Sequence, residues 1–335
     1  MAEIVTPEQI DRAAAVLRTG GLVAFPTETV YGLGANALDA EAVAGIFEAK
    51  GRPTFDPLIV HVTDAGEAAE LVASFPPLAE ELARRFWPGP LTMVLPKKPI
   101  VPDLVTAGLS TVAVRVPGHE LARALIARAR VPVAAPSANR FGGVSPTRAE
   151  HVAEELSGRI DLILDGGPCR TGVESTVISL TGVLRDEPPV LLRPGGLPVE
   201  QIEEVTGPLA APRTEDAAAD AEAGRMSPGM LDRHYAPRTP MRLVDDFDAS
   251  PGAGVALLSF RELEPALAER AVACEVLSRG GDLRQAAAAL FAAIRRLDGS
   301  GAELILAQRV PDRGLGRAIN DRLRRAAGSG AEVRD

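Results

Sequence analysis

The sequence predicts an α/β protein of two domains, and three observations along the chain support this class. Segments typical of buried strands alternate with segments typical of amphipathic helices up to about Val205. From Gly207 to Pro228 the composition changes to Ala, Pro, Asp, Glu and Gly without apolar periodicity, which is typical of a linker. A second alternation of strands and helices begins after Pro240. The expected parts are a first domain, a linker or lid, and a second domain, at residues 1–206, 207–238 and 239–335.

The first domain contains clear helix and strand signals. Thr6, followed three residues later by Gln9, resembles a capping box and predicts a helix that ends near Gly20. Asp39 is suited to cap a second helix, whose apolar positions share one face, and Gly51 is suited to end it. Further helices are expected at 119–129 and 148–157, and apolar runs typical of strands occupy 21–25, 58–62, 111–117 and 131–136.

The second domain is expected to be small and doubly wound, because strands and helices alternate in it. Its expected strand, helix, strand and final helix lie at 254–260, 283–297, 304–306 and 318–327. Arginines are frequent between Arg317 and Arg325, and we expect them to form a solvated helix face, with RNA contact as the alternative.

Charge and cysteine content exclude several classes of protein. The net charge is -9, with 36 Lys and Arg against 45 Asp and Glu, so binding of nucleic acid over the whole surface is not expected. A local basic cleft remains compatible with this charge. Cys169 and Cys274 are far apart and fit neither a disulfide scaffold nor a zinc site. Because no signal peptide and no apolar run of transmembrane length occur, we expect a cytoplasmic protein without membrane contact.

Polar and charged side chains gather between Pro26 and His61, around turns that separate predicted strands. Hydroxyl residues follow Pro26, while Lys50, Arg52 and His61 flank one short connection bounded by prolines. This composition is typical of an anion pocket and not of a core. A lysine near a helix C-terminus also complements the helix dipole, so a purely structural role for Lys50 stays open.

An arginine and several polar turns follow further along the chain. Arg115 lies inside an apolar run, where an unpaired charge is costly, so Arg115 needs an anionic partner. A ligand and a structural salt bridge are equally expected as that partner. Other predicted strands begin or end beside polar side chains, namely Ser137, Asn139, Ser145, Ser175 and Arg193.

These segments form an ordered set of motifs. The set comprises Pro26 to Gly34, Lys50-x-Arg52-Pro53, Pro57 to His61, Trp87 to Thr92, Thr111 to Arg115, Pro136 to Asn139, Glu174 to Thr176, Leu192 to Gly195, Ser227 to Met230, His234 to Pro237 and Leu315 to Arg322. The chain thereby resembles L-threonylcarbamoyladenylate synthases with a YrdC-like domain, in their long form, over nearly its whole length. The resemblance implies a YrdC-like twisted mixed-sheet catalytic domain and a small Rossmann-like C-terminal domain.

The resemblance also implies a reaction. Enzymes of this family are nucleotidyltransferases that combine L-threonine, bicarbonate or CO2, and ATP into threonylcarbamoyl-AMP and pyrophosphate. A downstream threonylcarbamoyl transferase complex then modifies the adenosine next to the anticodon of certain tRNAs. Mg²⁺ is expected as the ion bound with ATP, without a metal site of the protein's own, and a weak tRNA contact is compatible with the family.

Residue roles follow from the same resemblance, position by position. The residues expected to bind ATP are Arg52, Asp56, Thr111, Ser137, Ser145, Arg193 and Tyr235. Those expected to bind threonine are Thr29, His61, Arg115 and Ser175, and those expected to act in catalysis are Lys50, Arg52, Ser137 and Asn139. Two positions depart from the family pattern: Asp56 replaces a frequent Asn, and Ala135 replaces a frequent hydroxyl residue. We expect Asp56 to shift the metal or to turn away from the phosphates.

The segment from Ser227 to Pro237 is expected to be a lid that brings Tyr235 to the nucleotide and helps to exclude water. A rigid spacer is the alternative. Two other functions compete with the synthase: an RNA-binding module without catalysis, and a different carbamoyl-transfer enzyme. Enzymes of the latter kind normally carry zinc-binding and acylphosphatase-like modules, which this sequence lacks.

Overall fold

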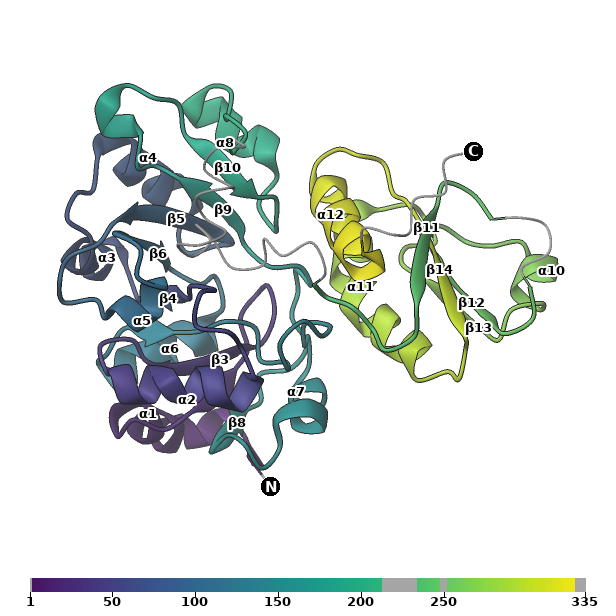
Figure 1. Ribbon diagram of the computed structural model, residues 1–335, viewed down its shortest axis with the longest axis horizontal. Coiled ribbons are helices and arrows are strands. Elements are labelled where there is room, and N and C mark those ends of the chain that lie inside the picture. Colours follow the sequence, from purple (N-terminus) through teal and green to yellow (C-terminus); the bar gives the residue numbers. More distant parts are fainter. Residues whose placement is uncertain (1, 213–233, 248–251, 329–335) are drawn as a thin grey trace. The chain divides into compact units, whose positions relative to one another are not determined.

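The computed structural model describes residues 2–212, 234–247 and 252–328, which form two compact units (Figure 1). Unit 1 contains most of the described residues before 213, and unit 2 contains those after 233. Two short segments expected in the first domain, Gly142–Ser145 and Thr171–Val173, belong to unit 2. Residues 213–233, with much of the predicted linker and the start of the predicted lid, lie outside the described residues. The exact domain boundaries and the lid therefore stay predictions.

Unit 1 is built on one mixed sheet. Its described strands are β1 (Glu3–Val5), β2 (Val23–Phe25), β3 (Gly32–Asn36), β4 (Ile59–His61), β5 (Leu91–Pro96), β6 (Thr111–Arg115), β7 (Val133–Ala134), β8 (Leu162–Leu164), β9 (Thr176–Ser179) and β10 (Val190–Arg193). Their order is β1-β8-β2-β3-β7-β4-β6-β5-β9-β10, and neighbours are parallel in some pairs and antiparallel in others. The mixed sheet implied by the family resemblance is confirmed.

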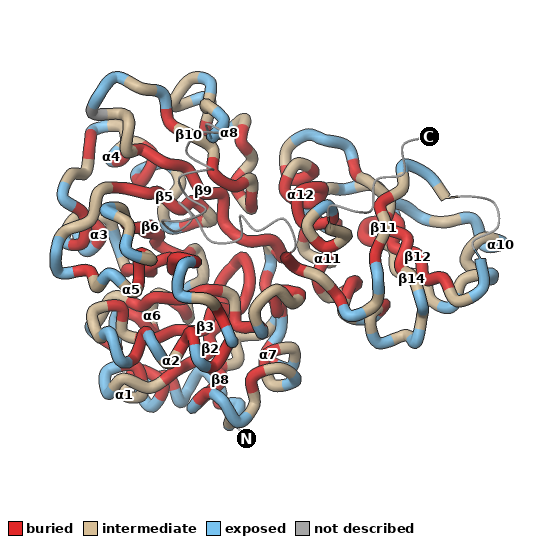
Figure 2. The backbone as a smooth tube through the Cα atoms, viewed as in Figure 1, coloured by how far each residue is buried: buried red, intermediate tan, exposed pale blue. Residues whose placement is uncertain are grey.

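Helices cover both faces of this sheet. The described helices are η1 (Pro7–Gln9), α1 (Ile10–Arg18), α2 (Ala40–Lys50), α3 (Ala65–Leu71), α4 (Pro77–Phe86), α5 (Asp103–Thr106), α6 (Glu120–Ala129), α7 (Ala149–Leu156), η2 (Val183–Arg185) and α8 (Val199–Thr206). Val23 and Phe25 pack into a core with α1 and α6, whereas Ala24 between them belongs to the core that includes α2. The strands between the two edges of the sheet are accordingly buried on both sides (Figure 2).

Helix α2 begins and ends where the sequence predicts. The Asp39 carboxylate accepts hydrogen bonds from the amides of Glu41 and Ala42 at 3.0 and 3.2 Å, which is an N-cap. Gly51 has a φ of 63°, the left-handed conformation that glycine adopts without a steric penalty. The two caps fix the position of Lys50, in the last turn of α2, and of Arg52 just beyond it.

One face of β4 and β6 carries the polar residues of interest. Val60 and Val114 belong to the large core, while Ile59 and Ala113 belong to a smaller apolar cluster on the opposite face. Because side chains alternate along a strand, His61 and Arg115 lie on the same face as the smaller cluster. The two strands are parallel, and His61 pairs with Arg115 in their register.

Unit 2 contains a parallel sheet in the order β11-β14-β12-β13. Its described elements are β11 (Met241–Val244), β12 (Val255–Ser259), α10 (Pro265–Ala268), β13 (Ala273–Val276), α11 (Leu283–Asp298), β14 (Leu304–Gln308) and α12 (Leu315–Ala327). Helices α11 and α12 pack together against this sheet, and residues around α10 cover the apolar cluster of Val255, Leu257 and Leu306. The predicted small α/β domain is confirmed, although β11 and β13 were not predicted and α12 begins three residues before the expected position.

One expectation for the last helix is wrong. Arg322 is 0% exposed, so this arginine does not belong to a solvated helix face. Its guanidinium lies 5.2 Å from the centre of the Tyr235 ring and donates a hydrogen bond to Asp321 at 2.5 Å. A cation–π contact and an ion pair together explain why a buried charge is tolerated there. Among the residues that the structure describes, no helix has the length and apolar character needed to cross a membrane.

Candidate functional site

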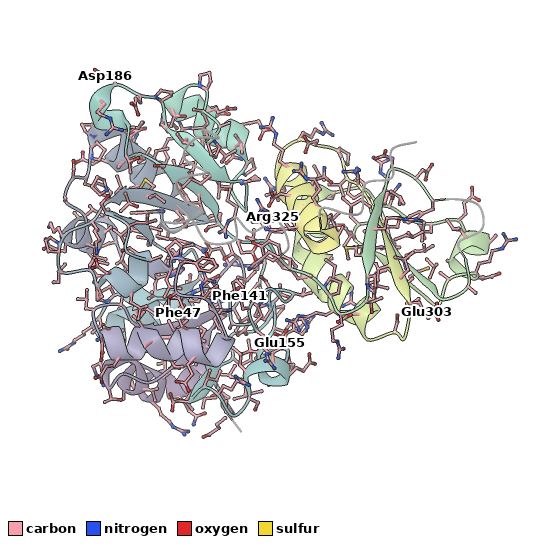
Figure 3. All side chains as sticks on the ribbon, in the orientation of Figure 1. Phe47, Phe141, Glu155, Asp186, Glu303 and Arg325 are labelled. Atoms are coloured by element: carbon pink, nitrogen blue, oxygen red, sulfur yellow. The ribbon has the colours of Figure 1, made fainter. Side chains whose placement is uncertain are left out.

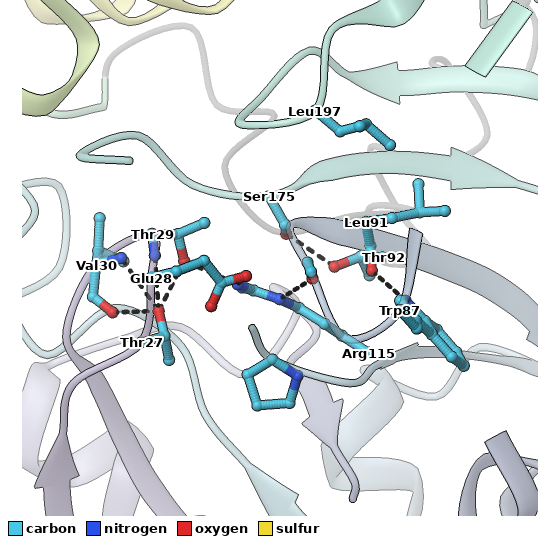
Figure 4. Close-up of polar contacts among 12 residues, drawn as sticks. Thr27, Glu28, Thr29, Val30, Trp87, Leu91, Thr92, Arg115, Ser175 and Leu197 are labelled. Carbon is cyan, nitrogen blue, oxygen red and sulfur yellow. Dashed lines mark hydrogen bonds and ion pairs between the residues drawn. The ribbon is translucent and has the colours of Figure 1, made fainter. Parts of the chain in front are cut away.

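A tight turn after β2 forms one side of the candidate site (Figure 4). The Thr27 hydroxyl donates to the Val30 carbonyl at 2.6 Å and lies 2.7 Å from the Thr29 hydroxyl. The amide of Val30 in turn donates to the Thr27 hydroxyl at 3.2 Å. Thr27, Glu28 and Thr29 are all buried. The turn therefore holds the Glu28 and Thr29 side chains in fixed positions.

Arg115 connects this turn to the end of β6. Its Nη2 atom donates to the Glu28 carboxylate at 2.6 Å and to the Thr29 hydroxyl at 3.1 Å, and its Nε donates to the Gly89 carbonyl at 3.2 Å. The structural salt bridge that the sequence left open is thus present. Nη1 makes no hydrogen bond with any described residue, so this nitrogen stays available to a ligand.

His61 lies next to Arg115 on the same face of the sheet. It is 3% exposed, and its Nδ1 atom lies 3.2 Å from the Ile59 carbonyl oxygen. Burial, and to a lesser degree the Arg115 guanidinium, lower the pKa of His61 to about 3. The imidazole is therefore neutral near pH 7 and can offer a hydrogen bond without adding charge.

Ser175 lies on the other side of Arg115, at the start of β9 (Figure 4). Its hydroxyl is 2.8 Å from the Thr92 hydroxyl, and its carbonyl accepts hydrogen bonds from Arg193 at 3.0 and 3.3 Å. Gly195 makes this approach possible, because a Cβ atom at Gly195 would lie 2.3 Å from the Ser175 carbonyl carbon. The structure thus brings Arg193, which was expected at ATP, next to Ser175, which was expected at threonine.

Lys50 is buried at the end of α2. Its Nζ atom donates to the carbonyl oxygens of Ser137 and Asn139, both at 2.5 Å. Burial first and the Arg52 guanidinium second lower the pKa of Lys50 to about 7. Since an ammonium group has three donors, one N–H remains after these two hydrogen bonds. Lys50 therefore holds the loop that carries two predicted catalytic residues.

Arg52 and Asp56 form a buried ion pair with an Nη2 to Oδ2 distance of 2.9 Å. Arg52 also donates to the carbonyl oxygens of Asp56 and Pro57 at 3.1 and 2.8 Å, and its Cζ lies 6.0 Å from the centre of the Phe141 ring. Phe141 is labelled in Figure 3. The carboxylate at position 56 is therefore turned toward a cation. At the other departure from the family pattern, Ala135 directly follows β7, and its amide donates to the Ile59 carbonyl.

The predicted residues occupy the two ends of the β4–β6 pair. His61 and Arg115 lie at the carboxyl ends. Thr111 starts β6, about 13 Å from Arg115 at the usual rise per residue. The register that pairs Ile59 with Ala113 brings Thr111 level with Pro57, whose carbonyl binds Arg52.

Ser137 lies at that same amino end of β4, since the nearby Ala135 amide binds the Ile59 carbonyl and β7 runs antiparallel to β4. The remaining predicted residues, Ser145 and Tyr235, belong to unit 2. Tyr235 is 1% exposed and stacks on Phe291 with ring centres 5.6 Å apart. The proposed contacts of both residues with ATP stay predictions.

Glu28 and Thr92 were not predicted as site residues. Glu28 lies within the Pro26 to Gly34 motif, and Thr92 ends the Trp87 to Thr92 motif, so each position was noted without a role. An acidic residue in a turn between two buried strands was the available signal for Glu28.

The fold and these side chains define an α/β protein with buried cations and hydroxyls gathered on one face of a mixed sheet. Residues 15–195 match the Sua5/YciO/YrdC family, described as telomere recombination, and residues 197–328 match the C-terminal domain of threonylcarbamoyl-AMP synthase. The chain therefore belongs to the Sua5/YrdC family and has its two-domain form.

Several relatives match over almost their full length. Threonylcarbamoyl-AMP synthase from Pyrococcus abyssi is 48% identical over 323 residues, which cover 94% of this chain and 93% of that protein. The protein of the same name from Bacillus subtilis is 46% identical, with coverages of 96% and 93%. The structure of P. abyssi Sua5 complexed with L-threonine has a TM-score of 0.86 and 44% identity, and the match covers 98% of this chain and 97% of that one.

Proposed function

We propose that this protein synthesises L-threonylcarbamoyl-AMP and pyrophosphate from L-threonine, bicarbonate or CO2, and ATP. The observation that carries the proposal is the arrangement of buried polar groups along one pair of parallel strands. His61 and Arg115 lie at the carboxyl ends, and Thr111 and the Arg52–Asp56 pair lie at the amino ends. Such an arrangement suits an amino acid at one end and a nucleotide at the other.

At the carboxyl ends, Arg115 would bind the threonine carboxylate through Nη1. A guanidinium suits this role because it is always charged and binds carboxylates directionally. The neutral His61 and the hydroxyls of Thr29 and Ser175 would add hydrogen bonds without further charge. These groups would hold the amino acid still while its ammonium nitrogen loses one proton, forms a bond to the carbon of CO2 and then loses a second proton.

At the amino ends, the remaining step is attack of a carbamate oxygen on the α-phosphorus of ATP, with pyrophosphate as the leaving group. Reactions of this type depend mainly on positioning and on stabilisation of negative charge. At these amino ends Lys50 and Arg52 would supply that positive charge, and Ser137 and Asn139 would contribute polar groups from the loop that Lys50 holds. Arg193, also expected at ATP, would approach the phosphates from its place beside Ser175.

Magnesium would enter as part of the MgATP substrate. Among the described residues, no group of three or more His, Cys, Asp or Glu side chains is arranged to hold a metal ion. The nearest predicted carboxylate, Asp56, is paired with Arg52. We propose that phosphate oxygens and water are the main ligands of this magnesium ion.

Lys50 makes ATP binding depend on pH. In the free protein the pKa of Lys50 is about 7, so the amine is mostly neutral at pH 8. Phosphate charge near Nζ favours the ammonium form and would raise this pKa. We therefore expect uptake of close to one proton when MgATP binds at pH 8, and weaker binding as pH rises from 7 to 9.

The measurement is calorimetry of MgATP binding in buffers of different ionisation enthalpy. Lys50→Met should lose the proton uptake, whereas Lys98→Met, which changes a lysine whose Nζ donates to the Ala69 carbonyl, should keep it. Equal proton uptake in the wild type and Lys50→Met would show that the protonation of Lys50 does not change when the nucleotide binds.

The proposed reaction is tested by pyrophosphate release that requires both L-threonine and bicarbonate. An RNA-binding module would release none, and a different carbamoyl-transfer enzyme would not require threonine. We further propose that the product passes to a threonylcarbamoyl transferase complex that modifies tRNA, and that any direct tRNA contact is weak. A cytoplasmic location stays a prediction.

A further inference from the structure

Glu28 is a buried carboxylate with unused acceptor capacity. Its side chain is 9% exposed, and among the described residues the one hydrogen bond that the carboxylate accepts comes from Arg115 Nη2. The Oε2 atom accepts no hydrogen bond from any of the described residues. A carboxylate has room for about four hydrogen bonds, and a buried one with unmet capacity is unfavourable.

The charge of Glu28 changes what Arg115 can bind. The two side chains form an ion pair of 2.6 Å, so together they carry no net charge. A simple carboxylate that approaches Arg115 would therefore be attracted by the guanidinium and repelled by the neighbouring Glu28. A zwitterion avoids this conflict, because its carboxylate can meet the cation while its ammonium group meets the anion.

The surrounding turn makes Glu28 a fixed partner. Hydrogen bonds of Thr27 with Thr29 and Val30 close the turn on both sides of Glu28. Gly118 lies against the carboxyl group, since a Cβ atom there would be 3.1 Å from Glu28 Cδ. Figure 4 shows Glu28 and Arg115 facing each other beside Thr29 and Ser175. The carboxylate is thus positioned before any ligand arrives.

We propose that Glu28 accepts the ammonium group of L-threonine and thereby selects α-amino acids over carboxylic acids that lack the amine. This inference rests on the proposed function. Glu28 and Arg115 then act together as one receptor for a zwitterion. Hydrogen bonds from the ligand's two charged groups to these side chains replace those that the groups lose on leaving water.

The test compares two ligands that differ only in the amine, L-threonine and (R)-3-hydroxybutanoate, by calorimetry. We expect the wild type to bind threonine at least about 10- to 100-fold more tightly, which is the usual effect of a hydrogen bond to a charged group. Glu28→Gln should weaken the binding of threonine and strengthen the binding of 3-hydroxybutanoate, so that most of this preference disappears. The control is Glu48→Gln, an exposed position on α2, which should leave the preference unchanged.

If Glu28 only holds Arg115 in place, Glu28→Gln should weaken the binding of both ligands equally, and the inference would be wrong. An unchanged preference would also overturn it. Glu28→Asp keeps the charge but shortens the side chain, and it should retain a preference for threonine. This variant tests the inference if Glu28→Gln does not fold. Failure of the proposed function is distinguishable, because the wild type would then release no pyrophosphate in response to threonine.

Discussion

Replacement of Arg115 by methionine is expected to abolish threonine-dependent turnover. The substitution removes the charge that we propose binds the threonine carboxylate, and loss of a desolvated charge contact costs about 2 to 5 kcal/mol, or about 30- to 5,000-fold in affinity. It also leaves Glu28 buried without its cation, so the free energy of unfolding should fall by about 3 to 5 kcal/mol. Calorimetry with threonine and chemical denaturation measure the two effects.

A double variant separates binding from stability. In Arg115→Met with Glu28→Gln, the uncompensated negative charge is gone, so much of the lost stability should return while threonine binding stays absent. Full threonine affinity in the single Arg115→Met variant would contradict the role of Arg115. Equal destabilisation by the single and double variants would contradict the pairing with Glu28.

Replacement of Arg52 by methionine is expected to have the second largest effect, on the nucleotide. The variant lacks the guanidinium that we propose contacts phosphate, and Asp56, which is 1% exposed, loses a cation 2.9 Å away. The remaining negative charge would then repel ATP, so we expect MgATP affinity to fall by about 30-fold or more. Threonine binding, at the other end of the strands, should change much less.

The companion change, Asp56→Asn, should raise the affinity for MgATP instead of lowering it. It removes the negative charge beside Arg52 while it keeps a side chain of similar shape, so MgATP should bind more tightly than in the wild type. Both affinities can be measured by calorimetry with a non-hydrolysable analogue. Weaker MgATP binding in Asp56→Asn would indicate that the carboxylate itself supports the nucleotide or its metal.

Local signals predicted most of the elements that position the site. Asp39 and Gly51 located α2, and apolar runs located β4 and β6. A helix cap and a strand buried on both faces each have a recognisable pattern within a few consecutive residues. The two strands of unit 2 that were missed, β11 and β13, are the edges of its sheet. Edge strands are less buried, as the residues of β13 show, so their apolar pattern is weak.

Contacts between residues far apart in the chain could not be predicted from such local patterns. The motifs indicated Arg115 and Lys50, but the ion pair with Glu28 and the hydrogen bonds to residues 137 and 139 depend on how turns fold over the sheet. Arg322 shows the same limit, because its charge pattern resembled a solvated helix face. One of its partners, the Tyr235 ring, lies 87 residues earlier in the chain.

The most direct test of the central claim follows the carbon of bicarbonate into the product. The protein is incubated with ATP, Mg²⁺, L-threonine and ¹³C-bicarbonate, and the nucleotides are examined by mass spectrometry while pyrophosphate is measured in parallel. We predict a threonylcarbamoyl-AMP species that is one mass unit heavier than with unlabelled bicarbonate, formed in equal amount to pyrophosphate and absent with Arg115→Met. Pyrophosphate without a labelled adenylate, or a labelled adenylate that forms without threonine, would contradict the account.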